Sequence, residues 1–363
     1  MKSLLKNPII LFIAVLLLPV ACSKDKEEKE LSAEEAKVEL RAASQEMTMT
    51  ATKAMETPAV STMMFFMELT GFDDFDMEFK SMLADPGNYR LSEINQLLRD
   101  NELPLKKLQN KSFLEDPQNT GIYTYNFQTQ EFDLASTSVN YLEVNFPADE
   151  TAFAQGKNNA ALTISNIEFE TVTYSDSWGT WEEEVLTRMN ILLLVDFAQV
   201  LTCDYSAIFN SKGAPTSMNL NIGMAPYEFT MTLTGSGVNY NSTIMFTENS
   251  TVIFNSSLDL KYNSDMDEID HISGFVHVPP LRFDGSVNNA MIEECDENIA
   301  CMNQYFDVTV KHTKLNRVLG HLEFRTYDDP YWDEQYAMLV VIYQDDSWEF
   351  LHEIFELFAD MKK

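Results

Sequence analysis

Polar and apolar residues alternate along most of the chain after Gly121. Tyr123, Tyr125 and Phe127 alternate with polar residues, and the same period of two recurs in many later stretches. Such alternation is typical of β-strands with one buried face. Beyond this first strand, we predict strands over residues 139–146, 161–174, 185–210, 217–222, 227–234, 239–247, 251–262, 272–278, 281–287, 305–314, 318–327 and 336–343. Their short connections leave no room for helices, so residues 111–345 are predicted to form a mainly antiparallel sheet.

Residues 191–195 break this alternation because they are apolar at every position. A strand that is apolar on both faces must be covered on both sides, as a central strand between layers is. The predicted fold class is therefore α+β, mainly antiparallel β, with a large layered or partly closed β-sheet.

A helical pattern precedes the sheet. Ala36, Leu40 and Ala43 recur at helical spacing, and Ser32 with Glu35 stands where a capping box begins a helix. We therefore predict a helix that begins near Ser32 and turns one apolar stripe toward a partner.

Shorter helices are predicted on either side of the sheet. Pro58 interrupts the first helix, and helices over residues 59–69 and 92–100 follow it. Residues 31–110 thus form a predicted N-terminal helical segment. An apolar stripe at helical spacing predicts a last, amphipathic helix over residues 346–363, packed on the sheet.

The first 30 residues have a different character. A basic start leads into the apolar run 9–18, which is followed by Ala21, Cys22 and a charge-dense stretch to residue 30. This order forms a secretory signal whose apolar run is too short to span a bilayer. Residues 1–21 are predicted to be a signal peptide and residues 22–30 a charged tether.

This end of the chain resembles the signal of bacterial outer-membrane lipoproteins, because Leu18, Ala21 and Cys22 fit the lipobox pattern. The resemblance implies cleavage after Ala21 and acylation of Cys22, palmitate included, so that acyl chains attach the protein to the outer membrane. The acidic stretch after Cys22 is similar to the signal that carries some lipoproteins to the cell exterior. A periplasmic orientation, and a plain cleaved signal that leaves a secreted protein, are the alternatives. Residues 121–147 also resemble uncharacterised lipoproteins of the same envelope type, which bring no known activity.

Charge restricts the partners. The chain has 57 acidic and 25 basic residues, for a formal net charge of −32. Neutralising phosphates needs clustered Lys and Arg, so the composition excludes nucleic acid as a partner. It also disfavours docking on anionic lipid.

Three cysteines follow Cys22. Cys295 and Cys301 enclose a short polar loop and form a candidate disulfide, which would stabilise the fold by roughly 2 kcal/mol through loop entropy. Cys203 would then be a buried free thiol. Zinc bound by the close pair and a histidine is the alternative, but no second cysteine pair supports it.

The sequence contains no recognisable catalytic motif. Phosphate loops, nucleophile elbows, His-Glu-x-x-His and dinucleotide fingerprints are all missing, and the five histidines lie far apart. No catalytic residue and no cofactor are predicted. A hydrolase without a recognisable motif remains one alternative.

Two stretches are candidate binding sites. Asp265, Asp267 and Asp270 have the ligand type of a calcium loop, but Asp270 stands where an EF-hand needs glycine. The alternative is a solvated acidic turn. Trp178 and Trp181 lie in a polar turn between strands and are a candidate platform for a sugar or a peptide, unless they fold back over the sheet.

The predicted function combines these observations. We expect a lipid-anchored cell-envelope protein with a non-catalytic binding or scaffold role, which recognises an extracellular glycan or protein. The alternative is a carrier of an apolar ligand or lipid in a β-sheet cradle, favoured by 19 Met and 24 Phe residues. The sequence alone names no ligand.

Overall fold

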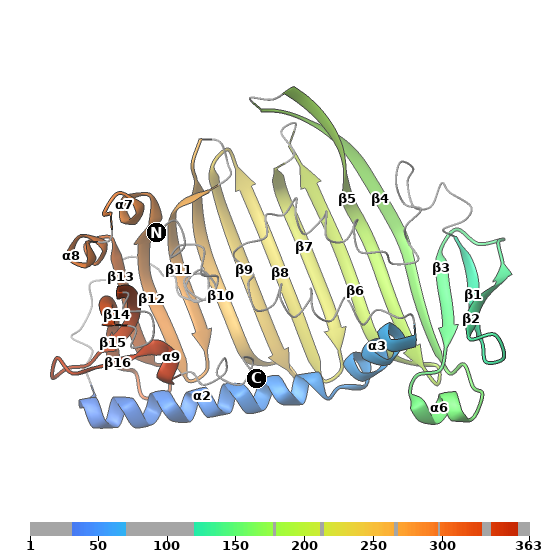
Figure 1. Ribbon diagram of the computed structural model, residues 1–363, viewed down its shortest axis with the longest axis horizontal. Helices are drawn as coiled ribbons and strands as arrows, with labels where there is room; N and C mark the ends of the chain where they lie inside the picture. The colour runs from blue at the N-terminus through green and yellow to red at the C-terminus, as the bar shows by residue number, and fades with distance from the viewer. Residues whose placement is uncertain are drawn as a thin grey trace. The chain divides into compact units, whose positions relative to one another are not determined.

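The fold is α+β and mainly β. The computed structural model describes residues 31–69, 120–176, 179–210, 214–264, 268–296, 298–328 and 335–354. Within these ranges the strands form one 16-stranded mixed sheet that is mostly antiparallel (Figure 1). This confirms the predicted fold class.

The strands follow one another as a long meander. They are β1 (Gly121–Asn126), β2 (Glu131–Ser136), β3 (Leu142–Phe146), β4 (Ala160–Asp176), β5 (Gly179–Val195), β6 (Ala198–Phe209), β7 (Pro215–Met224), β8 (Tyr227–Ser236), β9 (Asn239–Glu248), β10 (Thr251–Tyr262), β11 (Ile269–Val278), β12 (Leu281–Asn288), β13 (Phe306–His312), β14 (Arg317–Asp328), β15 (Gln335–Ile342) and β16 (Trp348–Phe350). From β16 back to β3, each strand lies beside the next one in sequence. β3 then pairs in parallel with β1, and β2 is the edge strand beyond it.

Helices are few in the part of the chain that the structure describes. They are α2 (Ala33–Met55), α3 (Pro58–Leu69), α6 (Glu150–Ala154), α7 (Asn289–Glu293), α8 (Ile299–Met302) and α9 (Leu351–Ile354). None of these described helices has the length and apolar character needed to cross a bilayer. The predicted helix over residues 92–100 lies outside the described residues.

The chain divides into two compact units. The first unit comprises Met1–Thr52, Thr234–Phe246 and Thr251–Lys363, and the second comprises Lys53–Leu233 and Thr247–Ser250.

In the first unit, α2 begins with the predicted capping box. The backbone N–H of Ser32 donates to Oε2 of Glu35 at 3.3 Å, and the backbone N–H of Glu35 donates to Oγ of Ser32 at 3.4 Å. Hydrogen bonds from Ser32 hold the pKa of Glu35 below its ordinary value. The predicted helix start is therefore confirmed, because two backbone donors that the helix cannot satisfy find side-chain acceptors.

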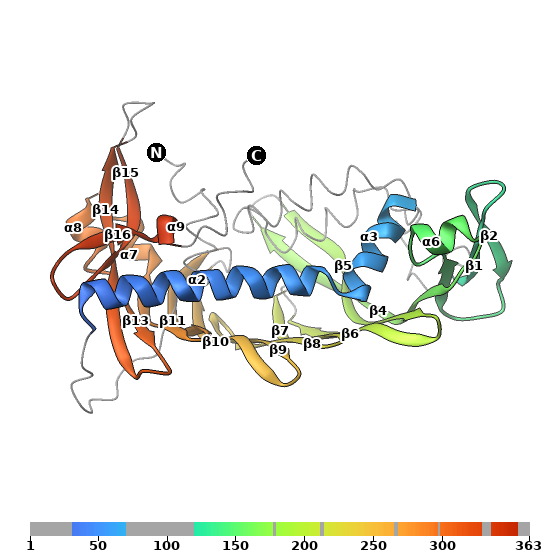
Figure 2. The ribbon, with the colours of Figure 1, turned by 90° about the horizontal axis from the view of Figure 1, so that it is seen from below.

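The apolar stripe of α2 packs against the sheet of the first unit (Figure 2). Ala36, Leu40 and Ala43 are buried in one cluster with residues such as Ile272 and Val310. The small alanine side chains let the helix lie close to the strands. This face of the strands β10 to β15 is thus the main core of the first unit.

In the second unit, Thr57 caps the start of α3, because its Oγ1 accepts from the backbone N–H of Val60 at 3.4 Å. Pro58 occupies the first helical position, where its missing N–H is not needed. Phe66 of α3 lies 4.6 Å from the ring centre of Phe146, in a cluster that also contains Tyr125. The core of the second unit therefore lies around α3 and β1 to β5.

The structure differs from the prediction in several places. The short helices α6, α7 and α8 lie in connections that were predicted without helices, and β2 was not predicted as a strand. Residues 185–210 form two strands, β5 and β6, which are joined at Asp196 and Phe197 with φ angles of 50° and 66°. The turn was missed because a phenylalanine is an unusual residue at positive φ. The predicted terminal helix also starts later, because residues 348–350 pair with β15 as β16 before α9 begins.

The strand over residues 191–195 is less covered than predicted. Leu193 is buried, whereas its four neighbours are half-buried. β5 is hydrogen-bonded to β4 on one side and β6 on the other, so its backbone is central in the sheet.

Candidate functional site

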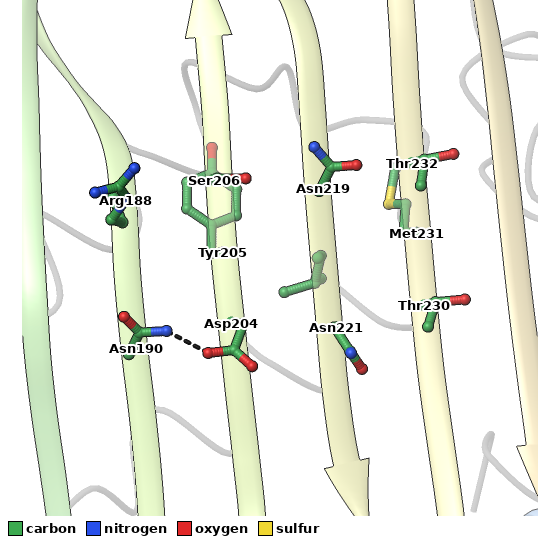
Figure 3. A pocket seen from close by; sticks show the side chains of 11 residues that line it. Arg188, Asn190, Asp204, Tyr205, Ser206, Asn219, Asn221, Thr230, Met231 and Thr232 are labelled. Carbon is green, nitrogen blue, oxygen red and sulfur yellow. Dashed lines mark hydrogen bonds between the residues drawn. The ribbon is translucent and has the colours of Figure 1, made fainter.

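A shallow depression of about 430 Å³ lies over four neighbouring strands of the second unit, β5 to β8 (Figure 3). Tyr205, Leu220 and Met231 line it together with eight polar residues. We call the polar residues the polar ladder: Arg188, Asn190, Asp204, Ser206, Asn219, Asn221, Thr230 and Thr232.

The strand register explains why these side chains share a face. Arg188 pairs with Ser206 and Asn190 with Asp204 between β5 and β6. On the other side of β6, Ser206 pairs with Asn219 and Asp204 with Asn221. Directly paired residues point to the same side of a sheet, and neighbouring strands lie about 4.8 Å apart. The ladder therefore presents two regular rows of polar groups.

The opposite face of the same strands is apolar. Tyr205, Leu220 and Met231 alternate with ladder residues and so point away from them. Burial raises the pKa of Tyr205. The alternation on β6 to β8 thus places these three apolar side chains on the face opposite the ladder.

Hydrogen bonds hold one row of the ladder in place. Nδ2 of Asn166 donates to Oδ1 of Asn190 at 2.8 Å, and Nδ2 of Asn190 donates in turn to Oδ1 of Asp204 (Figure 3). The amide of Asn190 is therefore fixed at both ends. Asp204 is exposed and, among the described residues, its Oδ2 has no hydrogen-bond donor, so this oxygen can accept from a ligand.

The second row of the ladder, Arg188, Ser206 and Asn219, begins with an ion pair. Apolar side chains lie beside this row. Nη1 of Arg188 lies 3.0 Å from Oε1 of Glu168 on β4, and both side chains are more than half exposed. A register shift between Glu168 and Phe169 places Phe169 opposite Leu186, on the face of the ladder. Ile208, two residues beyond Ser206 on β6, is 62% exposed on that face. Phe169, Leu186 and Ile208 form what we call the apolar border.

Asn219 and Asn221 complete the ladder as exposed amides. Neither side chain has a hydrogen-bond partner within the ranges that the structure describes. Each amide offers two donor hydrogens and one acceptor oxygen to a ligand. Amides, hydroxyls, one carboxylate and an apolar border together suit a ligand that carries many hydroxyl groups on an apolar ring.

Several residues predicted as sites lie outside the described residues. These are Ala21 and Cys22 at the signal cleavage position, Trp178 of the aromatic platform, and Asp265 and Asp267 of the calcium candidate. Trp181 lies in β5 opposite Tyr174, and Asp270 lies in β11. The platform, the calcium site and lipidation at Cys22 stay predictions.

The cysteines of the sheet region are described. Cys295 and Cys301 are joined in a disulfide, with Cα atoms 5.6 Å apart. Cys203 is a buried free thiol on the apolar face of β6, and burial raises its pKa. Among the residues that the structure places, no group of three or more His, Cys, Asp or Glu side chains is arranged to hold a metal ion.

Sequence reasoning missed the polar ladder. Its residues were predicted only as the solvent face of strands, since alternation does not distinguish a binding face from a solvated one. One signal was present, because Asn is depleted in strands, yet Asn190 lies in β5 and both Asn219 and Asn221 lie in β7.

No family model matches the chain, and no curated protein or solved structure is significantly similar to it.

Proposed function

We propose that this chain is a non-catalytic binding protein of the bacterial cell envelope, anchored in the outer membrane by acyl chains on Cys22, and that its polar ladder binds a neutral glycan. The observation that carries the binding role is the set of exposed Asn, Asp, Ser and Thr side chains held in register on β5 to β8. The lipoprotein-like residues Leu18, Ala21 and Cys22 support the location.

The chemistry of the ladder favours a neutral ligand. Glu168 neutralises Arg188, so Asp204 leaves the face with an excess negative charge. A carboxylate or sulfate ligand would be repelled by Asp204, whereas a hydroxyl group can donate to it. The apolar border gives the ring of a sugar a surface on which to bury its C–H face.

An array of neutral and acidic glycans tests the binding role. Full-length protein in detergent should bind a subset of the neutral glycans, and Asn219→Ala with Asn221→Ala should abolish that binding with little change in melting temperature, because both amides are exposed. The matched control is Gln128→Ala with Gln155→Ala, which removes two exposed amides of the second unit outside the ladder. Equal binding by the ladder variant and this control would refute the assignment.

Substitution of Asp204 tests the charge preference. Asp204→Asn keeps the shape of the side chain and removes its charge. We expect this variant to gain binding to uronic-acid glycans that the natural chain rejects. If acidic glycans bind the natural chain as well as neutral ones do, the charge argument is wrong.

The anchor is tested separately. Mass spectrometry of the mature N-terminal peptide should show acyl groups on Cys22, and Cys22→Ser should release the protein from the membrane fraction. Protease treatment of intact cells then separates the two orientations, because a body in the periplasm would survive it. An unmodified Cys22 would contradict the anchoring proposal and leave the binding proposal standing.

The carrier alternative would use the other face of the same strands. Tyr205, Leu220 and Met231 are half-buried there, so part of their apolar surface is open. Native mass spectrometry after mild extraction tests this role, since a carrier should retain a lipid-sized ligand. A preparation free of such a ligand would reject it.

A further inference from the structure

The polar ladder is organised in rows that run across the strands. The register of β5, β6 and β7 gives the members of the two rows: Asn190, Asp204 and Asn221 in the first, and Arg188, Ser206 and Asn219 in the second. On β8, which lies beside β7, Thr230 and Thr232 continue the two rows (Figure 3). Every strand from β5 to β8 therefore contributes one polar side chain to each row.

The apolar border follows the second row on one side. Leu186 precedes Arg188 by two residues on β5, and Ile208 follows Ser206 by two residues on β6. Because β5 and β6 are antiparallel and Arg188 pairs with Ser206, both apolar side chains lie on the same side of the row. Phe169 of β4 pairs with Leu186 and so belongs to that side as well. The chemistry of the face thus changes from polar to apolar at the second row.

This order sets the direction that a long ligand must take. Across the sheet, polar groups repeat from strand to strand at about 4.8 Å. Along β6, the next side chain on the same face lies about 7 Å away, and the series passes from Asp204 through Ser206 to the apolar Ile208. A linear ligand with polar edges therefore keeps its hydrogen bonds only if it lies across the strands.

An extended β-1,4-linked glycan of glucose or mannose has a matching repeat. Its linking oxygens are equatorial and stand at opposite ends of each ring, so the chain is a flat ribbon in which one sugar advances by nearly the spacing of two strands. Hydroxyl groups line the edges of this ribbon, while C–H groups cover its faces and can bury apolar side chains. Glucans with α-1,4 or α-1,6 linkages curl or bend and do not keep this repeat.

The first row has its hydrogen-bonding groups in place before a ligand binds. Asn190 is held between Asn166 and Asp204. Oδ2 of Asp204 has no donor among the described residues, and Asn221 is exposed. A sugar hydroxyl both donates and accepts, so it can bind to a carboxylate on one strand and to an amide on the next.

We propose that the polar ladder binds an extended β-1,4-linked glycan of glucose or mannose, which lies across β5 to β8 with one sugar per strand. The site then holds about four sugars, given the spacing of the strands. This inference rests on the proposed glycan-binding function and adds the linkage, the length and the direction of the ligand.

Three glucose hexamers that differ only in linkage test the shape of the ligand. They are cellohexaose, maltohexaose and isomaltohexaose, with β-1,4, α-1,4 and α-1,6 linkages, and β-1,4-linked mannohexaose is the fourth probe. In calorimetric titration of full-length protein in detergent, one of the two β-1,4-linked hexamers should bind at least tenfold more tightly than either α-linked one. Equal affinity for all hexamers would overturn the inference and leave glycan binding by the ladder in place. The same holds if other neutral glycans bind the ladder but neither β-1,4-linked hexamer does.

A series from the disaccharide to the hexamer of the bound glycan tests the length. Affinity should rise with each added sugar up to about four and then level off, because further sugars extend beyond the ladder. A plateau at two sugars would contradict the arrangement of one sugar per strand.

Removal of the hydroxyl groups of β8 tests the direction. Thr230→Val with Thr232→Val should weaken binding of the tetramer about tenfold, since two hydrogen bonds are lost. The trimer should keep its affinity, because β5 to β7 still hold three sugars. Valine is favoured in strands, so we expect the fold to be retained.

Thr171→Val with Thr173→Val is the matched control. Both threonines are exposed on β4, beyond Phe169, and the buried Val172 lies between them. This variant should bind trimer and tetramer as the natural chain does. The proposed direction is wrong if the β8 variant loses affinity for trimer and tetramer equally, if it loses none, or if the β4 control shows the same loss.

Discussion

In the first unit, strands β10 to β15 have a packed core on one face, which α2 covers with Ala36, Leu40 and Ala43. In the second unit, the strands that carry the polar ladder have half-buried residues such as Leu220 behind them. One type of sheet thus supports a closely packed core in one unit and an open polar face in the other.

The largest expected effect tests the difference in packing. Leu40→Ala removes a fully buried side chain of the first unit and should lower the free energy of unfolding by about 2 to 5 kcal/mol. Leu220→Ala removes the same atoms from a half-buried site on β7 and should cost about 1 kcal/mol. Urea denaturation measures both. Equal losses would mean that the two units are packed alike.

The disulfide adds a second contribution to the first unit. Cys295→Ala with Cys301→Ala should lower the free energy of unfolding by roughly 2 kcal/mol, because the short loop between them gains freedom in the unfolded chain. A reductant should lower the melting temperature of the natural chain and leave that of the double variant unchanged. Insensitivity of the natural chain to the reductant would contradict this contribution.

The turn between β5 and β6 provides a stabilising substitution in the second unit. Phe197 has a φ of 66° and is 97% exposed, so its ring has lost contact with the protein while its backbone is strained. Phe197→Gly should raise the free energy of unfolding by about 0.5 to 1 kcal/mol, since glycine adopts positive φ freely. Phe197→Ala is the control: it keeps a Cβ atom, and hence the backbone strain at positive φ, and should gain less stability. A loss of stability in the glycine variant would show that the ring has a packing role.

The smallest effect concerns pH and the first unit. The pKa of His277 is lowered in the folded chain, whereas in the unfolded chain it has its ordinary value of 6.5. The unfolded chain therefore binds the proton at a higher pH than the folded chain does. Stability from this group is present above pH 6.5 and falls as the pH drops toward the lowered pKa. His277→Gln should flatten that part of the curve of melting temperature against pH. An unchanged slope between natural chain and variant would remove His277 as its source.

The sheet was predictable from the sequence because alternation reports burial on one face. The strand over residues 251–262 was predicted with the bounds of β10, and Ser32 with Glu35 gave the start of α2. The β5–β6 turn was not predictable, because Phe197 is not a turn-forming residue and positive φ leaves no trace in hydrophobic periodicity.

The polar ladder was beyond sequence reasoning for a different reason. Asn190, Asp204 and Asn221 are separated along the chain, and only the register of β5 to β7 places them in one row. A slip of one residue in this register would move a ladder side chain to the other face. Strand pairing, rather than composition, creates the candidate site.

Hydrogen–deuterium exchange of the full-length protein, with and without the neutral polysaccharides mannan, dextran and galactan, tests whether the polar ladder binds a neutral glycan. We predict that at least one of them slows exchange in peptides from β5 to β8, and that the Asn219→Ala, Asn221→Ala variant loses this protection. Protection confined to other strands, or none with any of the three, would contradict the assignment of the polar ladder as a glycan-binding face.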